Sequence, residues 1–222
     1  LMLADLEVIE KRIERTRKML KSGDKKYHQE IELYEIIKDG LEKEIPVRSM
    51  DFAPELLEQV GQLFLLTSKP VIYAANISED DIQHVQENPH VSRLREYAER
   101  EGAEVLVICA KIEEEIAQLE DREKQEFLTE LGLEQSGLDR LIQASYRLLG
   151  LISFLTAGPK EVRAWTIPEG TRAPQAAGKI HTDFEKGFIR AEIVAYDQLM
   201  DCGSYGAARE KGLVRSEGKE YV

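Results

Sequence analysis

The chain has 222 residues, of which 42% are hydrophobic and 32% charged, and its formal net charge at pH 7 is -12. This length allows one large or two small domains with a hydrophobic core, and the negative charge argues against a protein that coats nucleic acid. The sequence has no apolar run long enough to span a membrane, no signal-peptide pattern, no DNA-specific signal and only two cysteines, so we expect an intracellular protein of the reducing cytoplasm.

Residues 1–45 have the hydrophobic periodicity of two helices. Apolar residues recur at helical spacing in residues 1–22 and again in residues 27–43, and a polar segment separates the two stretches. We therefore expect an antiparallel helical hairpin. Its basic tip contains Lys21, Lys25 and Lys26, which are candidate contacts for RNA or a ribosomal surface. The alternative is a solvated helix end without a partner.

A connector of residues 46–52 leads into a second helical region. The pattern predicts a helix over residues 51–66, with Asp51 as its N-cap and its apolar residues packed on a sheet. Further along, Asn88-Pro89 interrupts the chain. The residues that then indicate another short helix are Val91, Leu94 and Tyr97.

Two short apolar runs, residues 71–75 and 104–110, indicate neighbouring strands of a parallel sheet. In open sheets of this type, ligands bind beyond the carboxyl ends of the strands. We therefore expect Asn76 and Glu79 to lie close to Cys109-Ala110-Lys111, at an edge where a small molecule is recognised. The alternative is that Asn76 and Glu79 only cap the turn that follows the first strand.

The sequence after Lys111 is strongly acidic and helical in pattern. Paired carboxylates can serve acid-base or metal chemistry, but here they recur along a solvated helical face. We therefore expect neither catalytic nor metal-binding residues in this stretch. A further helix is predicted over residues 136–149, and Gly150 ends it.

From residue 151 the composition changes towards Gly, Pro, Thr and short strand patterns, which marks a domain boundary at residues 151–158. Strands are predicted at 162–167, 188–196 and 215–221, with a turn at 207–212, and a small β-grasp module fits this pattern. The segment 170–179, GTRAPQAAGK, has too long a glycine spacing for a Walker A loop, and Ile180 replaces the required Ser or Thr. We expect it to be a surface loop.

Asn76-Ile77-Ser78-Glu79 resembles the base-recognition element of the YchF or Obg-like ATPase family, which carries NxxE where related GTPases carry NKxD. Cys109-Ala110-Lys111 is similar to the SAK-like element. The segment 157–192 is similar to the TGS domain of this family and is far more specific than the four-residue motif. The resemblance extends over essentially the whole chain.

The resemblance implies an α/β fold. Residues 46–150 would be the C-terminal half of a P-loop GTPase-like parallel-sheet domain, residues 1–45 an inserted coiled-coil hairpin arm, and residues 151–222 a β-grasp TGS domain without its last strand. Measured against the family, the P-loop, the Mg²⁺-binding Ser or Thr and the switch segments are missing from these residues.

The nucleotide-binding candidates are Asn76, Ile77, Glu79, Cys109, Ala110 and Lys111. An Asn amide can bond purine N7 and the exocyclic group at C6. In NKxD proteins the Asp accepts from guanine N1 and N2, whereas here Ile77 offers an apolar flank and the acceptor is the longer Glu79. Changing this clamp relaxes or switches the base specificity. The resemblance implies ATP, with GTP as a second ligand, and Mg²⁺ bound by the missing P-loop part.

The resemblance also implies a ribosome-associated protein that hydrolyses ATP in its intact form, whereas this chain alone would supply the base pocket without turnover. TGS-like modules are associated with RNA or ribosome contact, and the candidates are Arg163, Trp165, Lys179, His181, Lys186 and Arg190. No nucleophile or metal set accompanies His181, which favours a structural histidine. The alternatives are a ribosome-binding module that acts independently of nucleotide and a helical regulatory protein with an acidic docking face.

Overall fold

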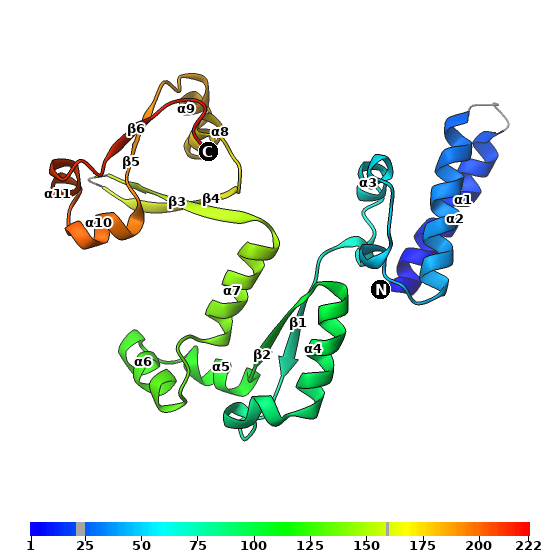
Figure 1. Ribbon diagram of the computed structural model, residues 1–222, viewed down its shortest axis with the longest axis horizontal. Coiled ribbons are helices and arrows are strands. Elements are labelled where there is room, and N and C mark those ends of the chain that lie inside the picture. Colours follow the sequence, from blue (N-terminus) through cyan, green and yellow to red (C-terminus); the bar gives the residue numbers. More distant parts are fainter. Residues whose placement is uncertain (21–24, 159) are drawn as a thin grey trace. The chain divides into compact units, whose positions relative to one another are not determined.

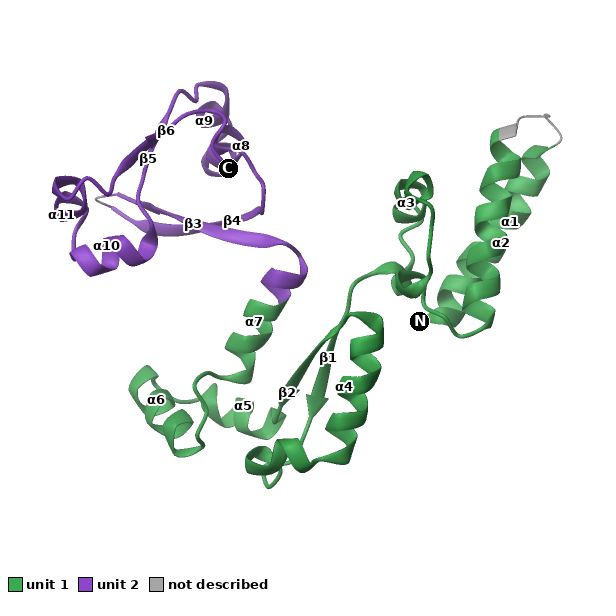
Figure 2. Cartoon of the chain, viewed as in Figure 1, with its two compact units in different colours: residues 1–144 green, residues 145–222 purple. Residues whose placement is uncertain are grey.

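The computed structural model describes residues 1–20, 25–158 and 160–222. The chain divides into two compact units, residues 1–144 and 145–222 (Figure 2). Unit 1 combines helices with a two-stranded parallel sheet, and unit 2 combines short helices with two antiparallel sheets of two strands each (Figure 1). The predicted α/β class is confirmed, and the division into three domains stays a prediction. Among the described residues, no helix has the length and apolar content needed to cross a membrane.

The first two helices, α1 (Met2–Met19) and α2 (Lys25–Glu42), pack side by side (Figure 1). Their buried residues recur at spacings of three and four, which gives each helix one apolar face. The residues of these faces that are at most 5% exposed are Ile9, Ile13, Leu33, Ile37 and Leu41. The two predicted helices are therefore present, and their description as a coiled coil stays a prediction.

The segment after the hairpin corrects one prediction. Instead of one helix over residues 51–66, it contains the short helices η2, α3 and η3, and Val60 and Leu65 pack into the core of the hairpin rather than on the sheet. The N-cap position is Ala53, not Asp51. A helix cannot continue to residue 66 because Phe64 has a φ of 54°. The bounds are η2 (Val47–Ser49), α3 (Pro54–Gly61) and η3 (Leu66–Ser68).

The side chain of Asp5 joins α1 to the chain that enters the sheet. Asp5 is 2% exposed, and its Oδ1 and Oδ2 accept hydrogen bonds from the N–H groups of Leu66 at 2.8 Å and Thr67 at 2.7 Å. The Thr67 Oγ1 in turn accepts from the Val47 N–H at 3.2 Å. A buried carboxylate is costly unless it is hydrogen-bonded, and the first N–H groups of η3 need acceptors. The contact satisfies both requirements.

The parallel sheet of unit 1 pairs Ile72 with Glu104 and Asn76 with Ile108. The helix between the strands begins after Asn88, whose Oδ1 accepts from two N–H groups of the first helical turn. The predicted strands and the helix between them are present, but the second strand ends at Ile108 instead of residue 110, because a helix begins at Ala110. The bounds are β1 (Ile72–Asn76), η4 (Ile82–Glu87), α4 (Pro89–Glu101) and β2 (Glu104–Ile108).

A polar network holds α4 against β1 and η2. The Arg48 Nη2 donates to the Glu101 Oε2 at 2.8 Å, and the Tyr73 hydroxyl donates to the same oxygen at 2.7 Å. The Tyr97 hydroxyl donates to the other oxygen at 2.8 Å. Burial alone would raise the pKa of Glu101, but the hydrogen bonds from Arg48, Tyr73 and Tyr97 outweigh it and lower the pKa below 4.5.

The acidic stretch forms two helices, and a third helix follows it. Cys109, Ile112, Ile116 and Leu128 bury a second, smaller core between the first two of these helices. The α7 helix matches the prediction over residues 136–149, and Gly150 follows it with a φ of 58°. The bounds are α5 (Ala110–Ile116), α6 (Asp121–Glu130) and α7 (Gly137–Leu148).

Unit 2 differs from the prediction in several segments. The strand predicted over 215–221 covers only Arg215–Glu217. Residues 173–180, expected to be a surface loop, form α8, and residues 205–210, expected to lie partly in a turn, form α11. The strand predicted over 188–196 is only three residues long, because α10 already begins at Tyr196. The bounds are β3 (Leu151–Ala157), β4 (Val162–Pro168), α8 (Ala173–Ile180), α9 (Thr182–Lys186), β5 (Ala191–Ile193), α10 (Tyr196–Cys202), α11 (Tyr205–Glu210) and β6 (Arg215–Glu217).

The Asp5→Ala variant should unfold at lower urea concentration, with a loss of about 2 kcal/mol or more in the free energy of unfolding. The reason is that the N–H groups of Leu66 and Thr67 lose their acceptors. Equilibrium urea unfolding measures this loss. The matched control is Asp39→Ala, because Asp39 makes only an exposed ion pair with Lys43. Equal stability of the two variants would contradict the structural role of Asp5.

The Glu101→Gln variant should be less stable than the unmodified chain at pH 7 by about 1–3 kcal/mol. Folding lowers the pKa of Glu101. Its contribution to the free energy of unfolding is therefore complete above the unfolded pKa of 4.5 and is lost as the pH falls through the folded pKa. The difference between the two proteins should therefore narrow below pH 4.5. Urea unfolding along a descending pH series tests this, with the exposed Glu99→Gln of the same helix as control. A difference that is independent of pH would refute it.

Candidate functional site

The carboxyl ends of β1 and β2 bring two of the predicted segments together. The Ile77 N–H donates to the Ile108 carbonyl at 2.9 Å, which continues the ladder one step beyond the strands. The Ala110 N–H donates to the Asn76 Oδ1 at 3.0 Å. The Asn76 side chain is therefore held by the first residue of α5. Its Nδ2 has no hydrogen-bond partner among the described residues and lies on an exposed side chain.

The two predicted charged residues of the site also meet. The Lys111 Nζ donates to the Glu79 Oε2 at 2.5 Å, and the two side chains are 67% and 48% exposed. The hydrogen bond to Glu79 and the charge of its carboxylate raise the pKa of Lys111 above its ordinary value. The pair is an exposed cation and anion beside Asn76, where a polar ligand can reach both groups.

Of the remaining predicted residues, one lies in the hydrophobic core and the other is partly buried against it. Cys109 is buried, and Ile77 packs against the cluster formed by Cys109, Ile112 and their neighbours. Their side chains support the loop from inside, so the apolar flank expected from Ile77 stays a prediction. The exposed surface of the site is formed by Asn76, Glu79, Ala110 and Lys111.

Glu113 is a residue that the sequence did not indicate. Its Oε1 accepts from the Gly137 N–H at 2.6 Å, and its Oε2 accepts from the Leu138 N–H at 3.1 Å. The carboxylate thus caps the N-terminus of α7, where negative charge is favourable. A Cβ at Gly137 would lie 2.7 Å from the Glu113 Oε1 and 2.9 Å from the Ile108 Cγ2, so a larger residue here would displace the capping carboxylate or Ile108. Glu113 and Gly137 are 24 residues apart in the sequence, so no local pattern reveals their contact.

Four of the contact candidates of unit 2 lie on β4, on α8 or between α8 and α9, and of these Arg163, Lys179 and His181 are exposed whereas Trp165 is half-buried. The guanidinium of Arg163 lies 4.3 Å from the centroid of the Trp165 ring, and the Trp165 Nε1 donates to the Thr156 Oγ1 at 2.9 Å. The His181 Nδ1 accepts from the Asp183 N–H at 3.2 Å and so caps α9, which supports the structural interpretation of this histidine. Lys179 lies in the last turn of α8.

The other basic candidates have simpler positions. Lys186 ends α9, and Arg190 is exposed just before β5. At the tip of the hairpin, Lys26 pairs weakly with Glu30 at 3.9 Å. Lys21 and the side chain of Lys25 lie outside the described residues.

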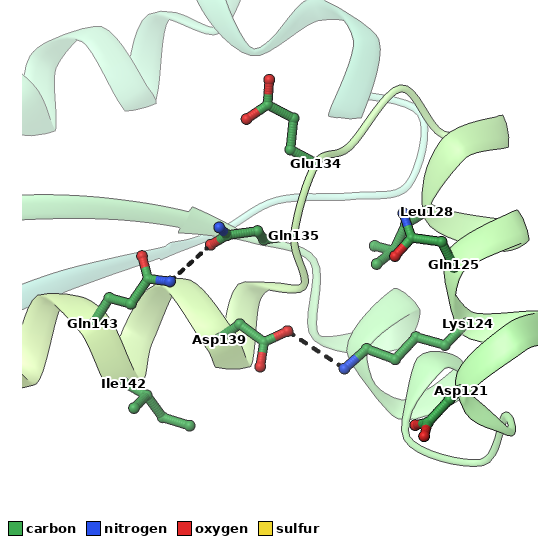
Figure 3. A pocket seen from close by; sticks show the side chains of 9 residues that line it. All are labelled: Asp121, Lys124, Gln125, Leu128, Glu134, Gln135, Asp139, Ile142 and Gln143. Atoms are coloured by element: carbon green, nitrogen blue, oxygen red, sulfur yellow. Dashed lines mark hydrogen bonds and ion pairs between the residues drawn. The ribbon is translucent and has the colours of Figure 1, made fainter. Parts of the chain in front are cut away.

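A polar hollow of about 510 Å³ lies between α6 and α7 (Figure 3). Lys124 and Asp139 point toward one another across it, 3.3 Å apart, and Gln143 donates to Gln135 at 3.1 Å. None of the predicted site residues lines it. Two pairs of its polar side chains are thus bonded to one another. In the part of the chain that is described, no set of His, Cys, Asp and Glu is arranged to hold a metal ion.

Comparison with known proteins shows which family the chain resembles. Over all 222 residues, the chain is 55% identical to the ribosome-binding ATPase YchF of Bacillus subtilis (strain 168). The chain belongs to the YchF family. It is also 46% identical to the ribosome-binding ATPase YchF of Escherichia coli O157:H7 over the same length, and residues 151–222 match the family model YchF-GTPase_C, described as a protein of unknown function (DUF933).

A solved YchF structure agrees with this assignment. The Schizosaccharomyces pombe YchF GTPase matches the whole chain with a TM-score of 0.81 and 35% sequence identity. The chain spans 61% of the length of the Bacillus YchF protein and 60% of each of the other two. The comparison therefore concerns about three fifths of a YchF protein.

The Glu113→Ala variant should lose about 1–2 kcal/mol of stability, because the first N–H groups of α7 lose their acceptor. Thermal or urea unfolding measures the loss. Glu114→Ala is the matched control, since Glu114 is an exposed carboxylate on the same helix. If both variants unfold like the unmodified chain, the cap contributes nothing.

Proposed function

We propose that this chain supplies the base-recognition site of a ribosome-associated ATPase, an activity that the names of its YchF relatives state for those proteins. The observation that carries the proposal is the hydrogen bond from the Ala110 N–H to the Asn76 Oδ1. This bond fixes the carboxamide oxygen toward α5 and leaves the Nδ2 donor for a ligand. Purine N7 is an acceptor, so the site suits a purine base.

The preferred nucleotide is ATP, and GTP is the weaker second ligand. A guanine clamp requires a carboxylate that is free to accept from both N1–H and N2–H. Glu79 instead has one oxygen engaged by Lys111. A site that leaves the donors of guanine unpaired disfavours it relative to adenine.

Hydrolysis requires further parts. Phosphoryl transfer needs a phosphate cradle, Mg²⁺ to neutralise charge on the phosphate oxygens, and an oriented water. The described residues contain no cluster of His, Cys, Asp and Glu that could hold a metal ion. In this proposal the 222 residues bind the base, and turnover belongs to a protein with the full length of the relatives.

The ribosome contact is placed on unit 2, interpreted as a TGS domain, and on the tip of the hairpin, interpreted as a coiled-coil arm. The stacked Arg163 and Trp165 support this, because an aromatic ring with an adjacent guanidinium can stack on unpaired RNA bases. This function places the protein in the cytoplasm, where ribosomes work. The second candidate function is a ribosome-binding module that acts independently of nucleotide, and the stacked Arg163 and Trp165 favour it as well.

Titration of the ¹⁵N-labelled chain with ATP should shift the amide NMR signals of Ala110 and Lys111. The Asn76→Ala variant should bind ATP about tenfold more weakly, because one or two hydrogen bonds are lost. Asn88→Ser, which retains a side-chain cap for α4, is the control. No shift at these amides would refute the base site.

Pelleting with ribosomes separates the two candidates. For a protein with the full length of the relatives, co-sedimentation that depends on ATP supports the ATPase, and co-sedimentation unaffected by nucleotide supports the binding module. Loss of pelleting in Trp165→Ala, at unchanged stability, would assign the contact to unit 2.

A further inference from the structure

The strand β2 has an edge without a partner strand, since among the described residues it pairs only with β1. The Ile108 carbonyl accepts from the Ile77 N–H on the β1 side. Successive residues of a strand direct their backbone groups to opposite sides, so Val105 and Val107 direct theirs to the open edge. Of these groups, only the Val107 carbonyl has a partner in the described part of the chain, the Arg140 Nη2 at 2.9 Å. The others are available to an additional strand.

A hollow of about 280 Å³ lies beside this edge. Side chains of η4, of α5 and of the loop after α6 give it an apolar lining, namely Ile82, Val85, Ile112 and Leu133. The side chains of Arg95 and Arg140 line it as well, whereas none of the four exposed residues of the base site does. A peptide that adds a strand to a sheet needs open backbone groups and a hollow for its alternate side chains. The edge of β2 offers both.

Arg140 shows which side chain such a peptide should carry. In the described part of the chain, its Nε is the one buried side-chain nitrogen or oxygen without a hydrogen-bond partner. A buried N–H without an acceptor is costly, and a carboxylate can accept from Nε and an Nη group together. Arg95 adds a second positive charge to the lining, and the Glu113 carboxylate, which also lines the hollow, is already bonded to the N-terminus of α7. The hollow therefore favours an acidic ligand.

We propose that the edge of β2 binds an extended segment of a partner protein as an added strand, and that Arg140 receives a carboxylate of this segment. An N–H of the segment replaces Arg140 at the Val107 carbonyl, and carbonyls of the segment accept from the N–H groups of Val105 and Val107. Arg140, released from the backbone, then gains an acceptor for its Nε. Without the partner, the charged side chain of Arg140 covers the edge, which is how natural edge strands avoid unwanted pairing.

Hydrogen exchange of the ¹⁵N-labelled chain, read by NMR, tests the added strand. In the free chain the amides of Val105 and Val107 should exchange faster than those of Leu106 and Ile108, which lie on the β1 side of the ladder. A saturating concentration of a capped pentapeptide of sequence TVEVT should slow exchange at Val105 and Val107 at least about tenfold. The peptide TVQVT should bind about tenfold more weakly, because it lacks the charge-assisted hydrogen bonds.

Two variants test the role of Arg140. The Arg140→Met variant should bind the two peptides with equal affinity, since it has no guanidinium for the carboxylate. The matched control is Arg93→Met, which removes an exposed arginine of α4 that does not line the hollow, and it should keep the tenfold difference of the unmodified chain. Urea unfolding of both variants shows whether they are folded, and the exchange measurement on the unmodified chain does not depend on them.

Equal affinity of the unmodified chain for the two peptides, or binding of neither, would overturn the proposal. Binding that leaves exchange at Val105 and Val107 unchanged would also overturn it. Protection of these amides without peptide that rises with chain concentration would assign the edge to a second copy. Protection without peptide only in a protein with the full length of the relatives would assign it to that protein's own residues. Both of the last results exclude the partner segment. No nucleotide is present, so the outcome is independent of the base site.

Discussion

The parallel pairing of β1 with β2 is the constraint on which the candidate site depends. Its register places Asn76 beside Ile108, and the next bond, from Ile77 to Ile108, extends the ladder into the loop. Only this register brings the first amide of α5 within reach of the Asn76 side chain. A shift by one residue would turn every side chain to the opposite face of the sheet. The site is therefore a consequence of strand register more than of any single polar contact.

The register is in turn supported by polar contacts at the far end of β1. Asp5 and Thr67 connect α1 and η2 to the segment that enters the strand, and Arg48, Tyr73 and Glu101 connect η2, β1 and α4. Each of these buried or half-buried groups has a partner, which is the condition under which buried polar groups stabilise a fold. The hairpin and the sheet share these contacts, so a change in the position of the hairpin acts first on the amino end of β1, opposite the site.

Local patterns in the sequence predicted the elements that depend on local causes. The strand runs, the chain break at Asn88-Pro89 and the glycine after α7 each carry their signal within a few residues, and the structure confirms them. The sequence could not predict contacts between distant residues. Asp5 binds backbone groups 61 and 62 residues away, and the partners of Glu113 are 24 and 25 residues away.

The helices of unit 2 were missed for a different reason. Segments rich in Gly, Ala and Pro are typical of loops. Pro174, however, stands in the first turn of α8, where proline is tolerated, and Gly178 lies where a Cβ would meet the Glu185 carboxylate. In the proposed base site, Asn76, Glu79, Ala110 and Lys111 could be named from the sequence. Their hydrogen-bond pattern could not, because it depends on which atoms the fold brings within bonding distance.

The net charge of -12 is compatible with a ribosomal partner, because carboxylates of this chain are engaged in helix caps and ion pairs. In α5 to α7, Glu113 caps α7, Glu120 and Glu123 form a capping box, and Asp139 pairs with Lys124. Charges used within a helix cap or an ion pair act over short distances, since salt screens exposed charges beyond about 8 Å at physiological ionic strength. An RNA contact then depends on the groups at the contact itself. Stacking on Arg163 and Trp165 requires no long-range attraction, so we expect such a contact to respond less to salt than the binding of a basic protein that neutralises many phosphates.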